Sequence, residues 1–444
     1  MTGKDRELLL AGKAPETPAA LRLTTVGVDA LAAFLREHYL EQYIAQGGSK
    51  IKFAAGRPGS GKTHFARLLE TEAAKAGYLT VSFSARKVWL HDFREVYLEI
   101  LRQCRIEQVL RGCAERIVES LGDDPAQIPE GKTYLDALSE RGEADALSKG
   151  EIRSSLRAFF TKNPLLDNSF AACCSLLTGD LLGHPVLESA NRELLLSYLH
   201  GDKTVKLSQL RALGLSPSRI TKFNARYLLR SLAEVVRLSG CRGILVTIDD
   251  MEALLNRSAG EVIRYTKLRR DDAYENIRQL IDDIDNMRSV LFLLCCGREL
   301  LENESYGFKS YQALWMRIQN EIVSTRFNQF ADMIDLDRYA DERYTPDALV
   351  EMSRRLVEAL GQSGADAADA TGEAAGSLVS ADADGEAAGS LVSADADGDA
   401  AGSRAQSVIS LEKAKELRER SEYGSIGLPY LVNRTVVEGG ADNE

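Results

Sequence analysis

Three observations predict an α/β fold with a parallel sheet as its core, a large helical insertion and a C-terminal helical lid. A glycine-rich stretch lies between a short strand pattern at 50–55 and a helical pattern that begins near residue 62. The runs 241–252 and 289–298 are almost wholly apolar until their last residues, as expected of strands that are buried on both faces. Between about 114 and 225 the pattern is helical and no strand is convincing.

The glycine-rich stretch matches G-x-x-x-x-G-K-[ST], the phosphate-binding loop of nucleoside triphosphatases. Its glycines let successive backbone N–H groups point inward at a polyphosphate, and the following helix turns its positive end toward the anion. Lys62 would supply a charge for the β- and γ-phosphates, and the Thr63 hydroxyl would ligate Mg²⁺. We therefore expect ATP and Mg²⁺ to bind here, through Gly56, Arg57, Pro58, Gly59, Ser60, Gly61, Lys62, Thr63 and His64.

A second strand is predicted at 77–84, followed by one helix from Leu90 through about Cys113. The insertion at about 114–225 comes next, and turn signals break it into several helices. Its last part is mildly basic, and solvated helix faces are favoured there over a nucleic-acid site. The basic residues are Lys203, Lys206, Arg211, Arg219, Lys222 and Arg226.

Carboxylates end the predicted strand 241–252. Acids at the carboxyl end of a parallel strand lie in the crevice where α/β sheets bind ligands. Asp249 would hold Mg²⁺ through water, and a neighbouring acid, Asp250 or Glu252, would orient or deprotonate the attacking water.

Two arginines are further candidates for catalysis. Arg298 ends the predicted strand 289–298, where a γ-phosphate sensor would sit, although an ion pair at a strand end explains it nearly as well. Arg317 lies in a predicted helix at 311–323 and would act on the nucleotide of a neighbouring subunit in an oligomer. A plain surface charge is the favoured interpretation of Arg317.

The C-terminal part alternates between helical and repetitive sequence. A short strand-like stretch at 330–336 precedes a helix that Thr345 caps and that reaches Leu360. A 13-residue acidic repeat occupies much of 362–406 and is too polar to form a core, so we expect a disordered linker. Helices at 410–421 and 424–438 follow. The predicted domains are an N-terminal segment (1–25, partly ordered), a core (26–310), and a lid (311–361 and 407–438).

The composition indicates a globular protein and argues against a general nucleic-acid coat and against a membrane-spanning protein. Hydrophobic and charged contents of 44% and 27% are those of a globular protein, and the net charge of −11 argues against a general nucleic-acid coat. No apolar run is long enough to cross a membrane, and no signal peptide is evident. Seven cysteines without a C-x-x-C pair indicate reduced thiols, so we expect a cytoplasmic protein.

Taken together, these stretches resemble the ATP-binding proteins of BREX phage-defence systems, especially the BrxD type. Such proteins group with AAA+ ATPases of the origin-recognition kind. The resemblance rests on Arg57–Phe65, the run up to Phe93, Gly243–Glu252 and Ala273–Arg278. It implies an AAA+-like ATPase that works with other defence-system proteins or DNA, in an oligomer or alone. The sequence leaves open whether a winged-helix unit is present.

Two departures from the family pattern leave the mechanism open. The family tends to have Asp-Glu where this chain has Asp249-Asp250. Three alternatives follow: Asp250 orients the attacking water with a shorter side chain, Glu252 takes over this role, or hydrolysis is slow. In the last case the protein would be a nucleotide-gated scaffold or DNA-binding loader. Residues 295–298 replace a more usual small polar sensor residue. A small-molecule kinase is a weaker alternative, because no acceptor-site signature is visible.

Overall fold

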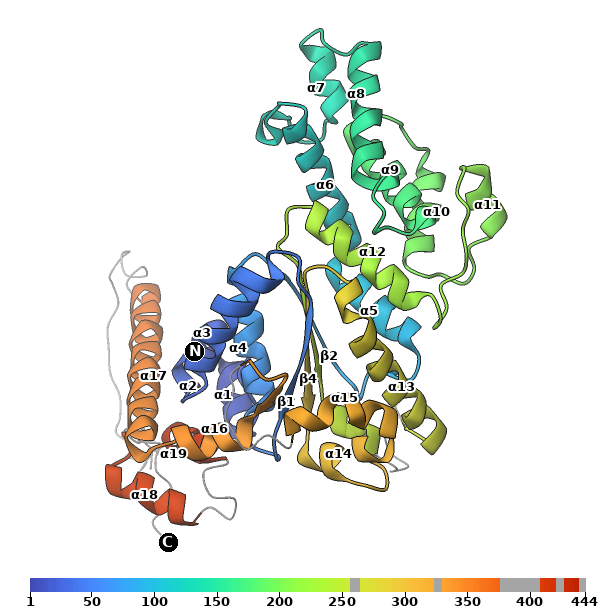
Figure 1. Cartoon of the computed structure of the whole chain (residues 1–444). Helices are drawn as coiled ribbons and strands as arrows, with labels where there is room; N and C mark the ends of the chain where they lie inside the picture. The colour runs from blue at the N-terminus through green and yellow to red at the C-terminus, as the bar shows by residue number, and fades with distance from the viewer. Residues whose placement is uncertain (256–263, 323–329, 376–407, 421–426, 439–444) are drawn as a thin grey trace, which may run out of the picture. The chain divides into compact units, whose positions relative to one another are not determined.

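A computed structural model describes residues 1–255, 264–322, 330–375, 408–420 and 427–438 of the chain (Figure 1). The chain divides into two compact units. Unit 1 comprises residues 1–29, 59–64 and 337–444, and unit 2 comprises 30–58 and 65–336. No helix in the described ranges combines the length and the apolar character that a bilayer crossing requires.

A five-stranded, all-parallel sheet forms the centre of unit 2, which confirms the predicted α/β class. Its strands lie in the order β2-β3-β4-β1-β5. Their bounds are β1 (Lys50–Ala55), β2 (Leu79–Ser84), β3 (Ile244–Asp249), β4 (Val290–Cys296) and β5 (Met333–Asp335). Strands β3 and β4 are buried almost end to end, as their continuous apolar runs predict.

The register brings the carboxyl ends of the strands to one edge of the sheet. Ala55 of β1 lies opposite Cys296 of β4, and Ser84 of β2 lies opposite Asp249 of β3. Because parallel strands end on the same side, the residues that follow Ala55, Asp249 and Cys296 emerge next to one another.

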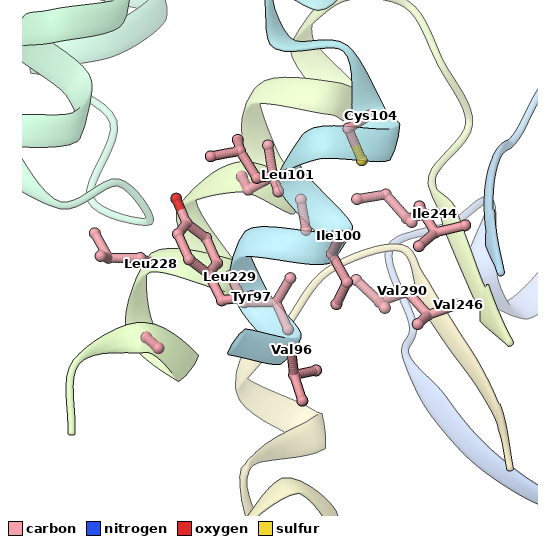
Figure 2. Close-up of a cluster of buried hydrophobic side chains, with 14 of the residues drawn as sticks. Val96, Tyr97, Ile100, Leu101, Cys104, Leu228, Leu229, Ile244, Val246 and Val290 are labelled. Atoms are coloured by element: carbon pink, nitrogen blue, oxygen red, sulfur yellow. The ribbon is translucent and has the colours of Figure 1, made fainter. Parts of the chain in front are cut away.

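Helices α5 (Phe93–Cys104) and α12 (Ala225–Leu238) carry the insertion on the sheet. Helix α5 packs against β2 and α12, and the interface is a continuous apolar cluster (Figure 2). Its labelled members are Val96, Tyr97, Ile100, Leu101, Cys104, Leu228, Leu229, Ile244, Val246 and Val290. The chain thus leaves the sheet along α5 and returns along α12, so both ends of the insertion are fixed.

The described residues of the insertion form helices and their connections and contain no strand, as predicted. It contains α6 (Ile106–Ser120), α7 (Tyr134–Glu140), α8 (Ala146–Leu156), α9 (Asn168–Leu182), α10 (Ser189–Leu199) and α11 (Leu207–Ala212). The predicted single helix from Leu90 to Cys113 is wrong. Arg105 adopts a left-handed conformation with φ 50°, which ends α5 and starts α6 in a new direction.

Unit 2 contains further helices. They are α3 (Asp29–Leu35), which continues as a π-helical stretch over Arg36–Ile44, α4 (Lys62–Lys75), α13 (Lys267–Asp283), α14 (Arg298–Glu302) and α15 (Gln312–Ile322). Helix α4 begins at Lys62, within the last two residues of the predicted phosphate loop, so the strand–loop–helix order is present.

Unit 1 has its own apolar core. It contains α1 (Gly3–Leu10), α2 (Pro18–Thr24), α16 (Leu336–Arg343), α17 (Pro346–Ala375), α18 (Leu411–Arg420) and α19 (Leu428–Glu438). Helix α1 packs on α19, and α17 packs on α2, α18 and α19, so the two ends of the chain share one core. Residues 1–25, expected to be partly ordered, contain two helices.

The predicted linker at 362–406 divides into two parts. Residues 362–375 form the end of α17, because the alanine-rich sequence before the repeat continues the helix. The remainder, 376–406, lies outside the described residues. All seven cysteines are free and all but Cys241 are buried. Burial raises the pKa of Cys104 and of Cys113 to about 12, which fits unreactive thiols.

Candidate functional site

The first residue of the glycine-rich loop is tied to the end of β4. The Gly56 amide donates a hydrogen bond to the Cys296 carbonyl at 3.2 Å, one residue beyond the β1–β4 ladder. Gly56 is buried and Arg57 is partly buried. The loop therefore leaves β1 at the place where β4 ends.

Glu252 lies at the same place. It belongs to a 3₁₀ turn, Met251–Leu255, that follows β3. A Cβ atom built on Gly297 would stand 2.8 Å from both Cγ and Oε1 of Glu252. The Glu252 carboxylate therefore rests against Gly297, the residue after the Cys296 carbonyl that holds Gly56. Only a residue without a side chain leaves room for it there.

Asp250 points the other way, toward the outer strand β2. The Ser84 hydroxyl donates to Asp250 Oδ2 at 2.6 Å, and Arg86 Nε lies 3.7 Å from Oδ1. Asp250 has a φ of 54°, an uncommon value for a residue with a side chain, and its amide donates to Asp249 Oδ1 at 2.8 Å. Strand β2 is separated from β1 by β3 and β4. Within unit 2, Glu252 thus lies near the start of the loop, and Asp250 is held away from it.

Asp249 closes β3 and has a second acid nearby. Burial raises the pKa of Glu70 on α4, and the charge of Asp249 raises it further, although hydrogen bonds to Ser82 and Thr247 oppose the shift. Two neighbouring carboxyl groups make a region of negative potential, which favours a cation at the end of β3.

The remainder of the loop, Gly59–His64, belongs to unit 1 and has the backbone that a phosphate cradle needs. Gly59 and Gly61 have φ values of 84° and 86°, which disfavour any residue with a side chain. The Ser60 hydroxyl is buried and has no hydrogen-bond partner among the described residues. A buried hydroxyl without a partner is costly unless a ligand satisfies it, so these residues fit a bound phosphate. Helix α4 starts at Lys62, immediately after Gly61.

His64 is held by the N-terminal segment. Its Nε2 lies 3.0 Å from the Thr25 hydroxyl, which in turn donates to the Leu21 carbonyl at 2.7 Å. Since the hydroxyl proton is used in that bond, His64 Nε2 is the donor to Thr25. The Tyr344 hydroxyl, near the end of α16, lies 3.6 Å from where a Gly61 Cβ would be. The first turn of α4 and the loop glycine therefore contact both terminal parts of unit 1.

The two candidate arginines both form ion pairs within the chain. Arg298 pairs with Asp335 at the end of β5 and lies 3.7 Å from Glu302. Arg317 on α15 contacts Asp282 on α13 at 2.7 and 2.9 Å, and this contact raises its pKa further above its ordinary value. Their roles toward a nucleotide stay predictions.

Sequence reasoning missed the residues that orient the acids. Ser84 and Arg86 hold Asp250, and Gly297 makes room for Glu252. Ser84 had a weak signal, because a polar residue at the end of a buried strand often faces a ligand site. The role of Gly297 has no sequence signal, because it depends on the direction of a side chain from the turn after β3.

One comparison with known proteins identifies a family for this chain. The family model described as BREX system ATP-binding protein BrxC/D matches residues 7–366, which is well over half of the chain. Searches of curated proteins and of solved structures each give no significant match. The match covers the glycine-rich loop, the acidic end of β3 and the sheet that carries both. This chain therefore belongs to the BREX system ATP-binding protein BrxC/D family.

Proposed function

We propose that this BREX ATP-binding protein is a magnesium-dependent, AAA+-like ATPase. It would act in the cytoplasm with other proteins of the defence system. The observation that carries the proposal is the position of Glu252 against Gly297, next to the carbonyl that anchors Gly56. A carboxylate beside the start of a phosphate loop is where a hydrolytic water must be oriented.

The residues divide the work as follows. The loop amides and Lys62 bind and orient the triphosphate, and the Ser60 hydroxyl gains the partner that it lacks. Thr63 and Asp249 would hold Mg²⁺, which neutralises charge on the phosphates when bound. Glu252 accepts a hydrogen bond, and then a proton, from the attacking water. The resulting phosphate and ADP leave separately.

Glu252 is a better base than Asp250 on two grounds. It has the longer side chain, and it rests against Gly297 at the end of β4. Asp250 accepts from Ser84 and lies near Arg86, both on the side of β2, so its carboxylate is directed away from the start of the loop. Its role would be to fix the turn that directs Glu252. This arrangement compensates for the aspartate that stands where the family tends to have glutamate.

Lys62→Ala tests the proposal. We expect the full-length variant to lose ATP binding and turnover, measured by titration with a fluorescent ATP analogue and by phosphate release. Lys75→Ala is the matched control, because Lys75 lies at the far end of the same helix and pairs with Glu72 at the protein surface. Full turnover in Lys62→Ala would refute the proposed site.

The position of Asp250 supports a second candidate function, a nucleotide-gated scaffold that binds ATP without hydrolysing it at a useful rate. Asp250, the acid nearest to Asp249 in the sequence, accepts from Ser84 and lies near Arg86 on the side of β2, so it is held away from the start of the loop. ATP binding with no phosphate release above background, with or without DNA and partner proteins, would favour the scaffold over the ATPase.

A further inference from the structure

One segment of the insertion is basic, although the chain as a whole is acidic. Residues 203–233 contain seven Lys and Arg residues and no Asp or Glu, although the whole chain has a net charge of −11. The segment comprises α11, the connection 213–224 and the first part of α12. Figure 1 shows α11 at the edge of the insertion. Five of its cations are exposed to solvent: Lys203, Lys206, Arg211, Arg219 and Lys222.

Most of these cations lack an acidic partner. Within the described residues, Lys203, Lys206, Arg211 and Lys222 form no ion pair. Arg219 donates to the Lys203 carbonyl at 2.9 Å, which ties the connection 213–224 to the start of the segment. Arg226 differs, because it pairs with Asp283 at 3.2 Å. The positive charge of the other five is therefore available to a ligand.

Exposed aromatic rings accompany the charges. Phe223 is 82% exposed and Tyr227 is 46% exposed, which is unusual for large rings on a globular domain. Lys222 Nζ lies 5.4 Å from the centroid of the Phe223 ring, and the Arg230 guanidinium lies 5.1 Å from that of Tyr227. Each ring therefore presents a flat apolar face next to a cation.

We propose that this surface binds single-stranded DNA. Phosphates would lie along the exposed cations, and bases would stack on Phe223 and Tyr227. Duplex DNA fits less well, because its bases are already stacked on one another and offer no free face on which the two exposed rings could stack. An acidic protein would match the charges but would not explain the rings. The proposal requires no contact to a 2′-hydroxyl, so DNA is the strand to which we commit. It is independent of the proposed ATP hydrolysis.

Fluorescence anisotropy of the full-length protein tests this surface, with a labelled oligothymidylate as probe and ATP absent. We expect binding that weakens with salt. The double variant Phe223→Ala/Tyr227→Ala should bind at least about tenfold more weakly, as expected for lost base stacking. Lys206→Glu/Arg211→Glu should also weaken binding and reduce the salt slope by about 1.4. All four residues are exposed or at the surface, so the fold should persist, and circular dichroism checks this.

Matched variants in the same insertion provide the control. Leu147→Ala removes another exposed apolar side chain, 68% exposed, and Lys149→Glu/Arg157→Glu reverses exposed charges outside the segment. Both should bind the probe like the original chain. The proposal is overturned by no binding up to about 100 µM protein at low salt. Equal loss in the control variants overturns it too, as does tighter binding of duplex DNA, of oligouridylate or of poly-glutamate than of the probe.

Discussion

Gly297→Ala tests the proposed position of Glu252 without changing any charged group. The new methyl group would stand 2.8 Å from Glu252 Cγ and Oε1 and 3.2 Å from Cδ, whereas ordinary contacts begin at 3.4 Å. The carboxylate must therefore move by about 0.6 Å or more. A misplacement approaching 1 Å in a catalytic group costs up to about 100-fold in rate. We expect kcat to fall by about 10- to 100-fold, or about 1.4 to 2.7 kcal/mol.

The same substitution should leave the fold almost unchanged. Gly297 has φ −78° and ψ 156°, which alanine adopts without strain, and the atoms it would meet belong to a flexible side chain. We expect the free energy of unfolding to change by less than about 1 kcal/mol. ATP affinity should stay within a few-fold of the original, because Glu252 is not proposed to bind the nucleotide.

Two measurements on the same samples test whether kcat falls while stability is unchanged. They are steady-state phosphate release at saturating ATP and thermal unfolding. Gly150→Ala is the control, since Gly150 has open space around it within α8. In the double variant Gly297→Ala/Glu252→Gln, the first change should add little to the second, because both act through one carboxylate. Unchanged turnover in Gly297→Ala, or fully additive losses, would refute the assignment of Glu252.

Three further predictions concern stability. Asp5 is buried, which by itself raises its pKa, but hydrogen bonds from the Thr2 and Thr17 side chains and from the amides of Glu16 and Thr17 outweigh this and lower it. Asp5→Asn should therefore lower the free energy of unfolding by about 2 kcal/mol at pH 7. Because the pKa of Asp5 is lower in the folded state than in the unfolded state, this difference between the variant and the original chain should shrink as pH falls below about 4. A difference that does not change with pH in acid unfolding curves would show that the ionised carboxylate is not the cause. Leu229→Ala, in the fully buried cluster of Figure 2, should cost about 2–5 kcal/mol in urea unfolding, and a cost below 1 kcal/mol would show that α12 is not firmly packed. Gly243→Ala would place a Cβ 2.1 Å from the Ser289 carbonyl oxygen, so we expect it to destabilise the sheet by at least about 2 kcal/mol, and normal thermal stability would contradict that close approach.

The sheet was predictable because its signals are local. Apolar runs 244–249 and 290–296 can be buried only as central strands, and a glycine loop after a strand fixes the first βα unit. Strand order was not predictable, because it depends on contacts between distant segments. The burial of Lys52 in β1 was not predictable either, because a charged side chain in a strand is normally expected to be exposed. Lys52 is buried and donates to the Phe330 and Ala331 carbonyls.

The site was predictable only as a set of candidates. Motif spacing identified the loop and the three acids, but it did not show which acid faces the loop. That choice depends on the left-handed backbone at Asp250 and on the space left by Gly297, neither of which has a sequence pattern. The break at Arg105 escaped prediction for the same reason, because a non-glycine residue with positive φ is set by tertiary packing.

The comparison of Glu252→Gln with Asp250→Asn tests the central claim most directly. Both changes remove one negative charge and keep the shape of the side chain. Single-turnover hydrolysis, with ATP binding measured on the same samples, should show that Glu252→Gln binds ATP but hydrolyses it about 10²- to 10⁴-fold more slowly. Asp250→Asn should retain at least about a tenth of the original rate, because it only supports the turn. The reverse order, with Asp250→Asn inactive and Glu252→Gln active, would contradict the account.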